Sequence, residues 1–412
     1  MARCFLTIVL FCAAGAVWAA ELPKYRIADL EAAAVSAHPV IQAWEQKIQG
    51  LSGEWAQAGL APNPVVSYEA EDFSGDAPFG KQGIFVSQEI VTNGKLARAR
   101  DVACGEIQAA QESLRAARLR VQTDVRIAAI AYLTLQKEQA FLEKYVHLNE
   151  TVCQYTEKLV ERGESSQLAL LNQRTELETS RQELEATKNQ QQAAWRRLAT
   201  VMGNPDWPQG ELTDSLECTP TVESWEKCLL LLEDANPELA RAAANLETAK
   251  RRLQLEAAKD SSDITVEGGA AYNTEENLIE GRIGVSIPLR IRDRNQGHIA
   301  AARSAVIVAQ NEYARVQLSL KNRLAMLYAE YKTAAESVQL YSKSILPQTE
   351  KLLSLAQSGY NHGELGYLEL LNVQVRYAQM HIKYFESLGD YWTQKTTLEG
   401  KLLTGCLEES VD

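Results

Sequence analysis

The chain has 412 residues, a formal net charge of −12, 46% hydrophobic residues and 23% charged residues. These proportions exclude bulk disorder, a disulfide-dense miniprotein and a collagen-like rod. The acidic balance argues against a nucleic-acid partner, because phosphate binding needs concentrated lysine and arginine. Glycine and proline together make up about 8% of the residues, against roughly 12% in average proteins. Long uninterrupted helices are therefore expected.

Residues 1–20 are predicted to be a secretory signal peptide. Arg3 precedes an apolar run from Cys4 to Ala20 that ends in small residues, and a polar stretch begins at Glu21. We expect cleavage after Ala19 or Ala20. A single membrane anchor is the alternative, although about 17 apolar residues are marginal for a span. Later windows are less apolar, so any further membrane contact is expected from strands.

Cysteine and histidine spacing predicts neither a complete disulfide framework nor a metal site. Five cysteines remain after the signal, which is an odd number. Cys218 and Cys228 could form one bridge, whereas the others lie in helical patterns as small core residues: Cys104, Cys153 and Cys406. Zinc-binding spacings are absent and the five histidines are scattered. We therefore expect no metal and no cofactor.

The two halves of the chain align with each other at an offset of about 200 residues. The matching segments are His38-Pro39 with Asn236-Pro237, Gly163-Glu164 with Gly363-Glu364, Leu170-Leu171-Asn172 with Leu370-Leu371-Asn372, and Gly203 with Gly405. One ordered offset along both halves indicates a tandem duplication, in which each half builds the same structural unit.

Each repeat is predicted to contain a helix, a β-hairpin, a very long helix and a returning helix. The first repeat covers 21–210, with an opening helix at 27–59, a hairpin at about 64–90, a long helix at about 94–160 and a returning helix at 167–201. An inter-repeat segment covers 211–235. The second repeat covers 236–405, with a hairpin at about 263–288, a long helix at about 295–357 and a returning helix at 367–403, before a tail at 406–412.

Both hairpins alternate between apolar and polar residues, which is the period of a β-strand. Val66 and Tyr68 oppose the carboxylates of the first hairpin, and Phe85 is an exception on the polar face. Such alternation suits a barrel wall between lipid and a wet lumen, and it also suits a soluble hairpin on a core. Four strands are too few to enclose a lumen, so several chains would share the barrel. The lumen-facing candidates are Glu69, Glu71, Asp263, Glu267 and Arg282.

The long helices carry coiled-coil spacing. In the first, apolar residues recur in steps of four and three from Val121 to Val146, and Ile127 and Ile130 begin a second apolar line. Contacts on two sides predict a ring of helices rather than a pair. At 1.5 Å per residue, the helix would extend roughly 100 Å. The second long helix mirrors the first, and Pro347 is expected to kink it.

These features resemble the TolC family of outer-membrane efflux channels, and among them most closely the CzcC and CusC type of metal-efflux channel. The resemblance covers nearly the whole mature chain and is carried by the duplicated plan and by Ile345-Leu346-Pro347-Gln348, Gly359-Tyr360, Gly363-Glu364 and Leu368-Glu369-Leu370-Leu371-Asn372. It implies a mainly α fold with a transmembrane portion: a homotrimer whose strands form one 12-stranded β-barrel in the outer membrane lipid, and whose helices form a periplasmic α-helical barrel. It further implies a periplasmic membrane-fusion adaptor protein and an inner-membrane RND-type pump as partners.

The turns at 162–166 and 361–366 would form the periplasmic tip of the channel. Glu164 and Glu364 occupy equivalent places there, so six carboxylates in a trimer would attract cations. These glutamates could instead cap the returning helices. Relatives often carry aspartate after the leucine of this motif, where the two repeats have Ala169 and Glu369. The tip and gate candidates are Glu164, Glu364, Glu369, Arg162 and His362.

The predicted function is passive conduction of substrate, with heavy-metal cations favoured by the resemblance and by the acidic lumen candidates. The sequence contains neither a recognisable catalytic set nor a phosphate-binding loop, so we expect no enzyme and an energy source in a partner. A TolC-type channel for drugs or secreted proteins is the first alternative. A soluble periplasmic coiled-coil scaffold is the second, and it leaves the alternating hairpins unexplained.

Overall fold

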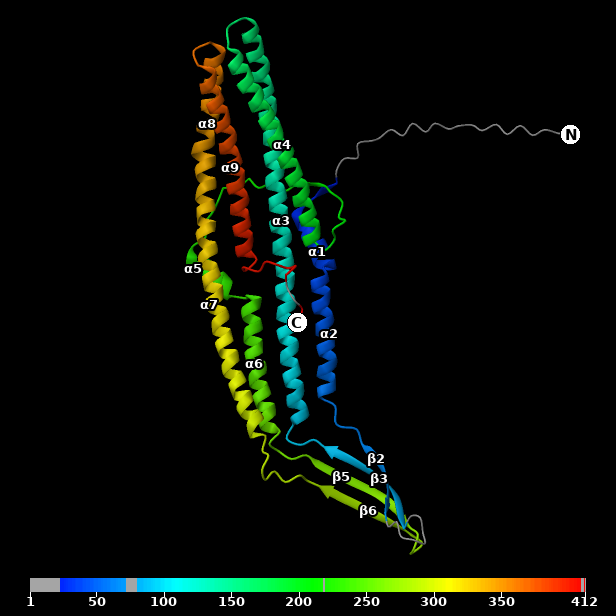
Figure 1. Cartoon of the computed structure of the whole chain (residues 1–412). Coiled ribbons are helices and arrows are strands. Elements are labelled where there is room, and N and C mark those ends of the chain that lie inside the picture. The colour runs from blue at the N-terminus through cyan, green and yellow to red at the C-terminus, as the bar shows by residue number, and fades with distance from the viewer. Residues whose placement is uncertain (1–22, 72–79, 218, 409–410, 412) are drawn as a thin grey trace, which may run out of the picture.

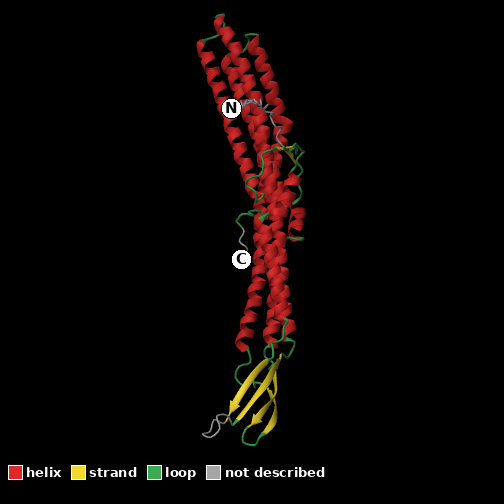
Figure 2. Ribbon diagram, turned by 90° about the vertical axis from the view of Figure 1, so that its right-hand side faces the viewer, coloured by secondary structure: helices red, strands yellow, loops and turns green. Residues whose placement is uncertain are grey.

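The computed structural model describes residues 23–71, 80–217, 219–408 and 411. The predicted signal peptide, Cys218 and the loop of the first hairpin therefore lie outside the described residues. The described chain is an elongated bundle of helices with a β-sheet at one end (Figures 1 and 2). None of the helices formed by these residues has both the length and the apolar character that crossing a membrane requires.

The first half of the chain supplies the longest helix. Its elements are β1 (Lys24–Tyr25), α1 (Ile27–Ala37), α2 (Pro39–Ala58), β2 (Val65–Glu71), β3 (Lys81–Ile90), α3 (Lys95–Glu161) and α4 (Gln167–Val201). The second half repeats the plan with β4 (Glu211–Leu212), α5 (Trp225–Glu233), α6 (Pro237–Ala258), β5 (Ile264–Asn273), β6 (Leu278–Ser286), α7 (Gln296–Leu340), the π-helix η1 (Tyr341–Ile345), α8 (Leu346–Asn361) and α9 (Tyr367–Glu399).

The opening helix predicted at 27–59 is divided into α1 and α2. A residue before proline is disfavoured in the helical region, and His38 is extended, with φ −66° and ψ 129°. Its Nδ1 accepts a hydrogen bond from the Val40 N–H at 3.3 Å, so His38 caps α2. In the second half, Asn236 caps α6 in the same way, accepting from the Glu238 N–H at 2.9 Å.

A π-helical turn directly precedes the segment that contains Pro347, where the sequence predicts a kink. Proline lacks an N–H and its ring clashes with the carbonyl four residues earlier in an α-helix. The chain meets this constraint by widening at Tyr341–Ile345, where the Leu346 N–H bonds to the Tyr341 carbonyl, five residues back. Helical structure is thereby uninterrupted from α7 through η1 to α8.

Helix α3 runs along the whole bundle (Figure 1) and packs against α1, α2, α4, α6 and α9. Near the sheet it packs between α2 and α6, and α7 lies beyond α6. Toward the far end it packs against α4 and α9, and α9 also packs against α7 and α8. The far end consequently holds two helical hairpins, α3–α4 and α8–α9.

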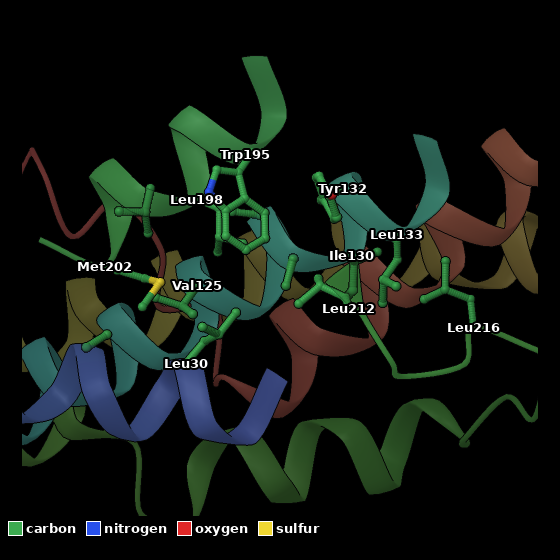
Figure 3. Packing of buried hydrophobic residues seen from close by; sticks show 14 of the residues in the cluster. Leu30, Val125, Ile130, Tyr132, Leu133, Trp195, Leu198, Met202, Leu212 and Leu216 are labelled. Atoms are coloured by element: carbon green, nitrogen blue, oxygen red, sulfur yellow. The ribbon is translucent and has the colours of Figure 1, made fainter. Parts of the chain in front are cut away.

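The main hydrophobic core lies midway along the bundle, where the inter-repeat segment meets α1, α3 and α4 (Figure 3). Tyr132 and Trp195 pack edge to face with ring centroids 5.0 Å apart, and the Tyr132 hydroxyl donates to the Gly210 carbonyl at 2.8 Å. Val121 and Val125, from the predicted coiled-coil line, are fully buried. Each such side chain contributes about 1.5–3 kcal/mol of burial free energy.

The two hairpins join into one antiparallel sheet in the order β2-β3-β5-β6. The pairing of β3 with β5 links the halves of the chain. Ser67, Phe85, Gly269 and Arg282 lie in one row across the four strands. Strands β2 and β6 are the edges of this sheet.

Candidate functional site

The sheet has one apolar face and one charged face. The apolar face exposes large side chains to solvent in the single chain, with Ile283 86% exposed and Val66 68% exposed. Its other exposed members are Tyr68, Ile84, Val86, Ile279 and Val285. An exposed band of aliphatic and tyrosine side chains on a strand pair is the surface that lipid covers in membrane barrels.

Charged side chains meet at the centre of the opposite face. The Arg282 Nη2 donates to Glu69 Oε2 and to Glu267 Oε1, each at 2.7 Å. Lys81 forms a second ion pair with Glu280, whose carboxylate also accepts from Asn273 at 3.0 Å. We call the residues Glu69, Glu267, Arg282 and Phe85 the central belt.

The central belt shows that the sheet curls toward its charged face. Arg282 lies on β6 and Glu69 on β2, the two edge strands. Residues from all four strands, from Glu69 on β2 to Arg282 on β6, line one small cavity on this face, and these two side chains are in direct contact at 2.7 Å. The charged face is therefore concave, and the apolar face is convex.

Phe85 breaks the alternation for a structural reason. It lies on the charged face but is only 3% exposed, because its ring lies against Gly269, where any Cβ would overlap the ring and the Phe85 backbone. The Arg282 guanidinium covers the ring from the other side, 4.0 Å from its centroid. Sequence reasoning marked Phe85 as an exception. The signal that could have explained it is the glycine at 269, but the pairing of β3 with β5 is not visible in local patterns.

Asp263, a predicted lumen residue, lies directly before strand β5 and joins the sheet to the helices. Its carboxylate accepts from the Thr92 N–H at 2.7 Å and from Lys95 Nζ at 2.8 Å. Lys95 also donates to the Ser261 carbonyl at 2.6 Å and is nearly buried. Sequence reasoning did not identify Lys95, whose partners lie about 170 residues away.

The far-end turns have the same backbone in both repeats. Gly163 and Gly363 each have φ +74°, a conformation that glycine adopts without strain. The next residue closes the turn in each case: the Glu164 N–H donates to the Leu159 carbonyl and the Glu364 N–H donates to the Gly359 carbonyl, both at 2.8 Å. The side chains of both glutamates are exposed at this end of the molecule.

The caps of the returning helices come from other residues. At α4, Ser166 Oγ accepts from the Ala169 N–H at 3.1 Å. At α9, the Glu369 carboxylate accepts from the Gly366 N–H at 3.3 Å. Glu369 thus has a capping contact. Arg162 and His362 are exposed in the turns, and His362 Nδ1 lies 2.8 Å from the carbonyl of Ser358 in its own helix.

Buried polar contacts hold the two far-end hairpins together. The Thr156 and Tyr360 hydroxyls are 3.2 Å apart, which joins α3 to α8. The Tyr367 hydroxyl donates to Gln173 Oε1 at 3.2 Å, which joins α9 to α4. Burial raises the pKa of Tyr367 above its ordinary value, so the hydroxyl keeps its proton.

Within the described ranges, histidine, cysteine, aspartate and glutamate form no group of three or more that could hold a metal ion. Cys153, Cys228 and Cys406 are buried among hydrophobic side chains. The suggested bridge from Cys228 involves Cys218, which lies outside the described residues.

A duplicated bundle of very long helices that carries a curled sheet, apolar outside and charged inside, is the architecture of an outer-membrane channel subunit. The family of outer membrane efflux proteins matches residues 32–204 and 230–402. The chain belongs to this family, and the two matched segments follow the duplication seen in the sequence.

Two relatives and one solved structure extend this finding. The chain is 26% identical to the cobalt-zinc-cadmium resistance protein CzcC of Cupriavidus metallidurans, over 87% of this chain and 85% of the relative. It is 23% identical to the nickel-cobalt-cadmium resistance protein NccC of Alcaligenes xylosoxydans xylosoxydans, over 79% and 74%. The fold matches the crystal structure of CusC with a TM-score of 0.75 and 16% identity, over 93% of each chain.

The predicted resemblance to TolC-type efflux channels of the CzcC and CusC type is thereby confirmed, and so is the fold class. The protein is an outer-membrane protein with its helical portion in the periplasm. Its family consists of channel-forming efflux proteins rather than enzymes.

Proposed function

We propose that three copies of the chain form one channel through the outer membrane. The concave charged face of the sheet carries this proposal, because it supplies one third of a barrel wall with lipid outside and water inside. Edge strands β2 and β6 offer unpaired backbone groups to neighbouring copies, and three four-stranded sheets give 12 strands. The proposed lumen then includes Glu69, Glu71, Glu267 and Arg282.

The proposed cargo is heavy-metal cations. The names of CzcC and NccC associate both relatives with resistance to cobalt and cadmium, together with zinc for CzcC and nickel for NccC. In a trimer, Glu164 and Glu364 would place six carboxylates around the periplasmic mouth, where they would attract cations and repel anions. Transport energy would come from an inner-membrane RND-type pump, joined to this end by a periplasmic adaptor protein, while the channel itself conducts passively.

Two experiments test the assembly and the cargo. Detergent-extracted outer membranes are run on gels without heating. We expect a heat-sensitive species near three times the mass of one chain, and a soluble monomer would refute the channel.

A strain lacking the gene is then tested for growth with cobalt, zinc and cadmium salts and with unrelated drugs. Selective metal sensitivity supports the proposal, whereas selective drug sensitivity refutes the metal cargo.

The tip carboxylates are tested by complementing that strain with the double variant Glu164→Gln, Glu364→Gln. We expect partial loss of metal tolerance at an unchanged amount of heat-sensitive oligomer. Glu54→Gln is the matched control, because Glu54 is an exposed glutamate on α2, far from the turns. Full tolerance with the double variant would show that the ring does not assist conduction.

A further inference from the structure

Arg282 bridges the two carboxylates of the central belt. Its Nη2 contacts one carboxylate oxygen of Glu69 and one of Glu267, each at 2.7 Å. Since both oxygens lie 2.7 Å from the same nitrogen, no more than 5.4 Å separates them. Two carboxylates at such a separation are oxygen ligands that one metal cation can share.

The guanidinium is held in position rather than free to swing into the lumen. The Phe85 ring lies 4.0 Å beneath it, and that ring rests on Gly269. An aromatic face below and two charge-assisted hydrogen bonds at the side fix a guanidinium better than either contact does separately. The belt therefore carries one net negative charge per chain, and removal of Arg282 would leave two.

The neighbouring row of the sheet repeats this arrangement with different residues. Lys81 on β3 pairs with Glu280 on β6, and strand β5 lies between these two strands. Basic side chains thus contact carboxylates in two rows of the charged face, from residues far apart in the sequence. The acidic face predicted from the sequence is in fact partly neutralised.

We propose that Arg282 is a specificity-determining residue of the channel: it occupies Glu69 and Glu267 so that multivalent cations pass the barrel without being retained there. This inference rests on the proposed function, in which the charged face lines the lumen. A conducting pore must bind its ions weakly enough to release them. Three uncompensated carboxylate pairs around one barrel would instead form binding sites for the cargo.

The test measures block of the purified protein in planar bilayers at low salt, with the trivalent cation hexaamminecobalt added to one side at a time. We expect Arg282→Gln to lower the half-blocking concentration from the barrel side at least about tenfold, because a trivalent ion gains attraction from each freed carboxylate. Block from the tip side should not change. Arg292→Gln is the matched control, since Arg292 lies beyond the end of β6.

A second variant keeps the inference open to refutation if Arg282→Gln does not assemble. Glu69→Gln with Glu267→Gln leaves Arg282 in place without its carboxylates, and we expect barrel-side block weaker than in the wild type. Equal barrel-side block in wild type and either variant would overturn the role of Arg282 while leaving the channel intact. Absence of both conductance and a heat-sensitive oligomer in the wild type would instead refute the proposed function.

Discussion

His381 on α9 makes the stability of the periplasmic helices sensitive to acid. Its ring stacks on Phe141 with centroids 4.5 Å apart and an interplanar angle of 18°, and Tyr377 lies at the same distance on another side. The side chain is 12% exposed, and its Nε2 lies 3.9 Å from Glu350 Oε1, beyond hydrogen-bond distance. Burial lowers the pKa of His381 from 6.5 to about 4.

The lowered pKa fixes the direction and size of the effect. Unfolded chains bind a proton at His381 near pH 6.5, whereas the folded chain resists protonation until about pH 4. His381 therefore has little effect on the free energy of unfolding above pH 6.5, and it lowers this free energy as pH falls from 6.5 to 4. At 1.36 kcal/mol per pKa unit, the loss is about 2 kcal/mol per chain at pH 5.

Thermal unfolding of the detergent-solubilised protein, followed by circular dichroism, tests this reasoning at pH 8 and pH 5. His381→Leu removes the titrating group, so the Tm of this variant should fall less than the wild-type Tm between pH 8 and pH 5. The difference between the two falls should be about 2 °C for a chain of this size. Half-buried Glu138 and Glu183, which lies on the bundle surface, both have pKa values raised by partial desolvation, and they affect both proteins alike. The control is His147→Gln, whose histidine side chain is 83% exposed. An equal pH response in wild type and His381→Leu would refute the argument.

Two further predictions concern packing and the joint between sheet and helices. Gly389→Ala would place a Cβ 2.7 Å from Thr134 Oγ1, so overpacking of about 1–3 kcal/mol should outweigh a helix-propensity gain of about 1 kcal/mol. Gly50→Ala, with nothing within 4 Å of the new Cβ, should raise the Tm. A change of Tm in the same direction for Gly389→Ala and Gly50→Ala would contradict this reasoning. Lys95→Gln removes the cation from Asp263 and should lower the yield of heat-sensitive oligomer, whereas exposed Lys24→Gln should not.

Features that depend on local spacing could be predicted from the sequence. Strand alternation gave the two faces of the sheet, and the paired glycines at 163 and 363 gave the turns, because each property belongs to a few consecutive residues. Contacts between the repeats depend on distant partners. Local spacing does not show that Asp263 contacts Thr92 and Lys95, because these residues belong to the other repeat.

Counting charged residues along each strand likewise does not predict which charges on the concave face are paired. Glu69, Glu267 and Arg282 lie on one face of the sheet, yet the sequence does not show that one guanidinium reaches both carboxylates. That contact requires the curl of the sheet and the glycine beneath Phe85, which are properties of strand pairing across the duplication. A count of carboxylates along the strands therefore overestimates how many of them lack a basic partner.

The two repeats also differ where their backbones agree. Both far-end turns use a glycine with φ +74°, but α4 is capped by the Ser166 hydroxyl and α9 by the Glu369 carboxylate. Helix α3 is continuous, whereas its counterpart contains the π-helix η1. In the proposed trimer the six tip glutamates therefore form two sets of three in different surroundings. Glu164 lies on the α3–α4 hairpin and Glu364 on the α8–α9 hairpin, so the proposed ring has threefold rather than sixfold symmetry.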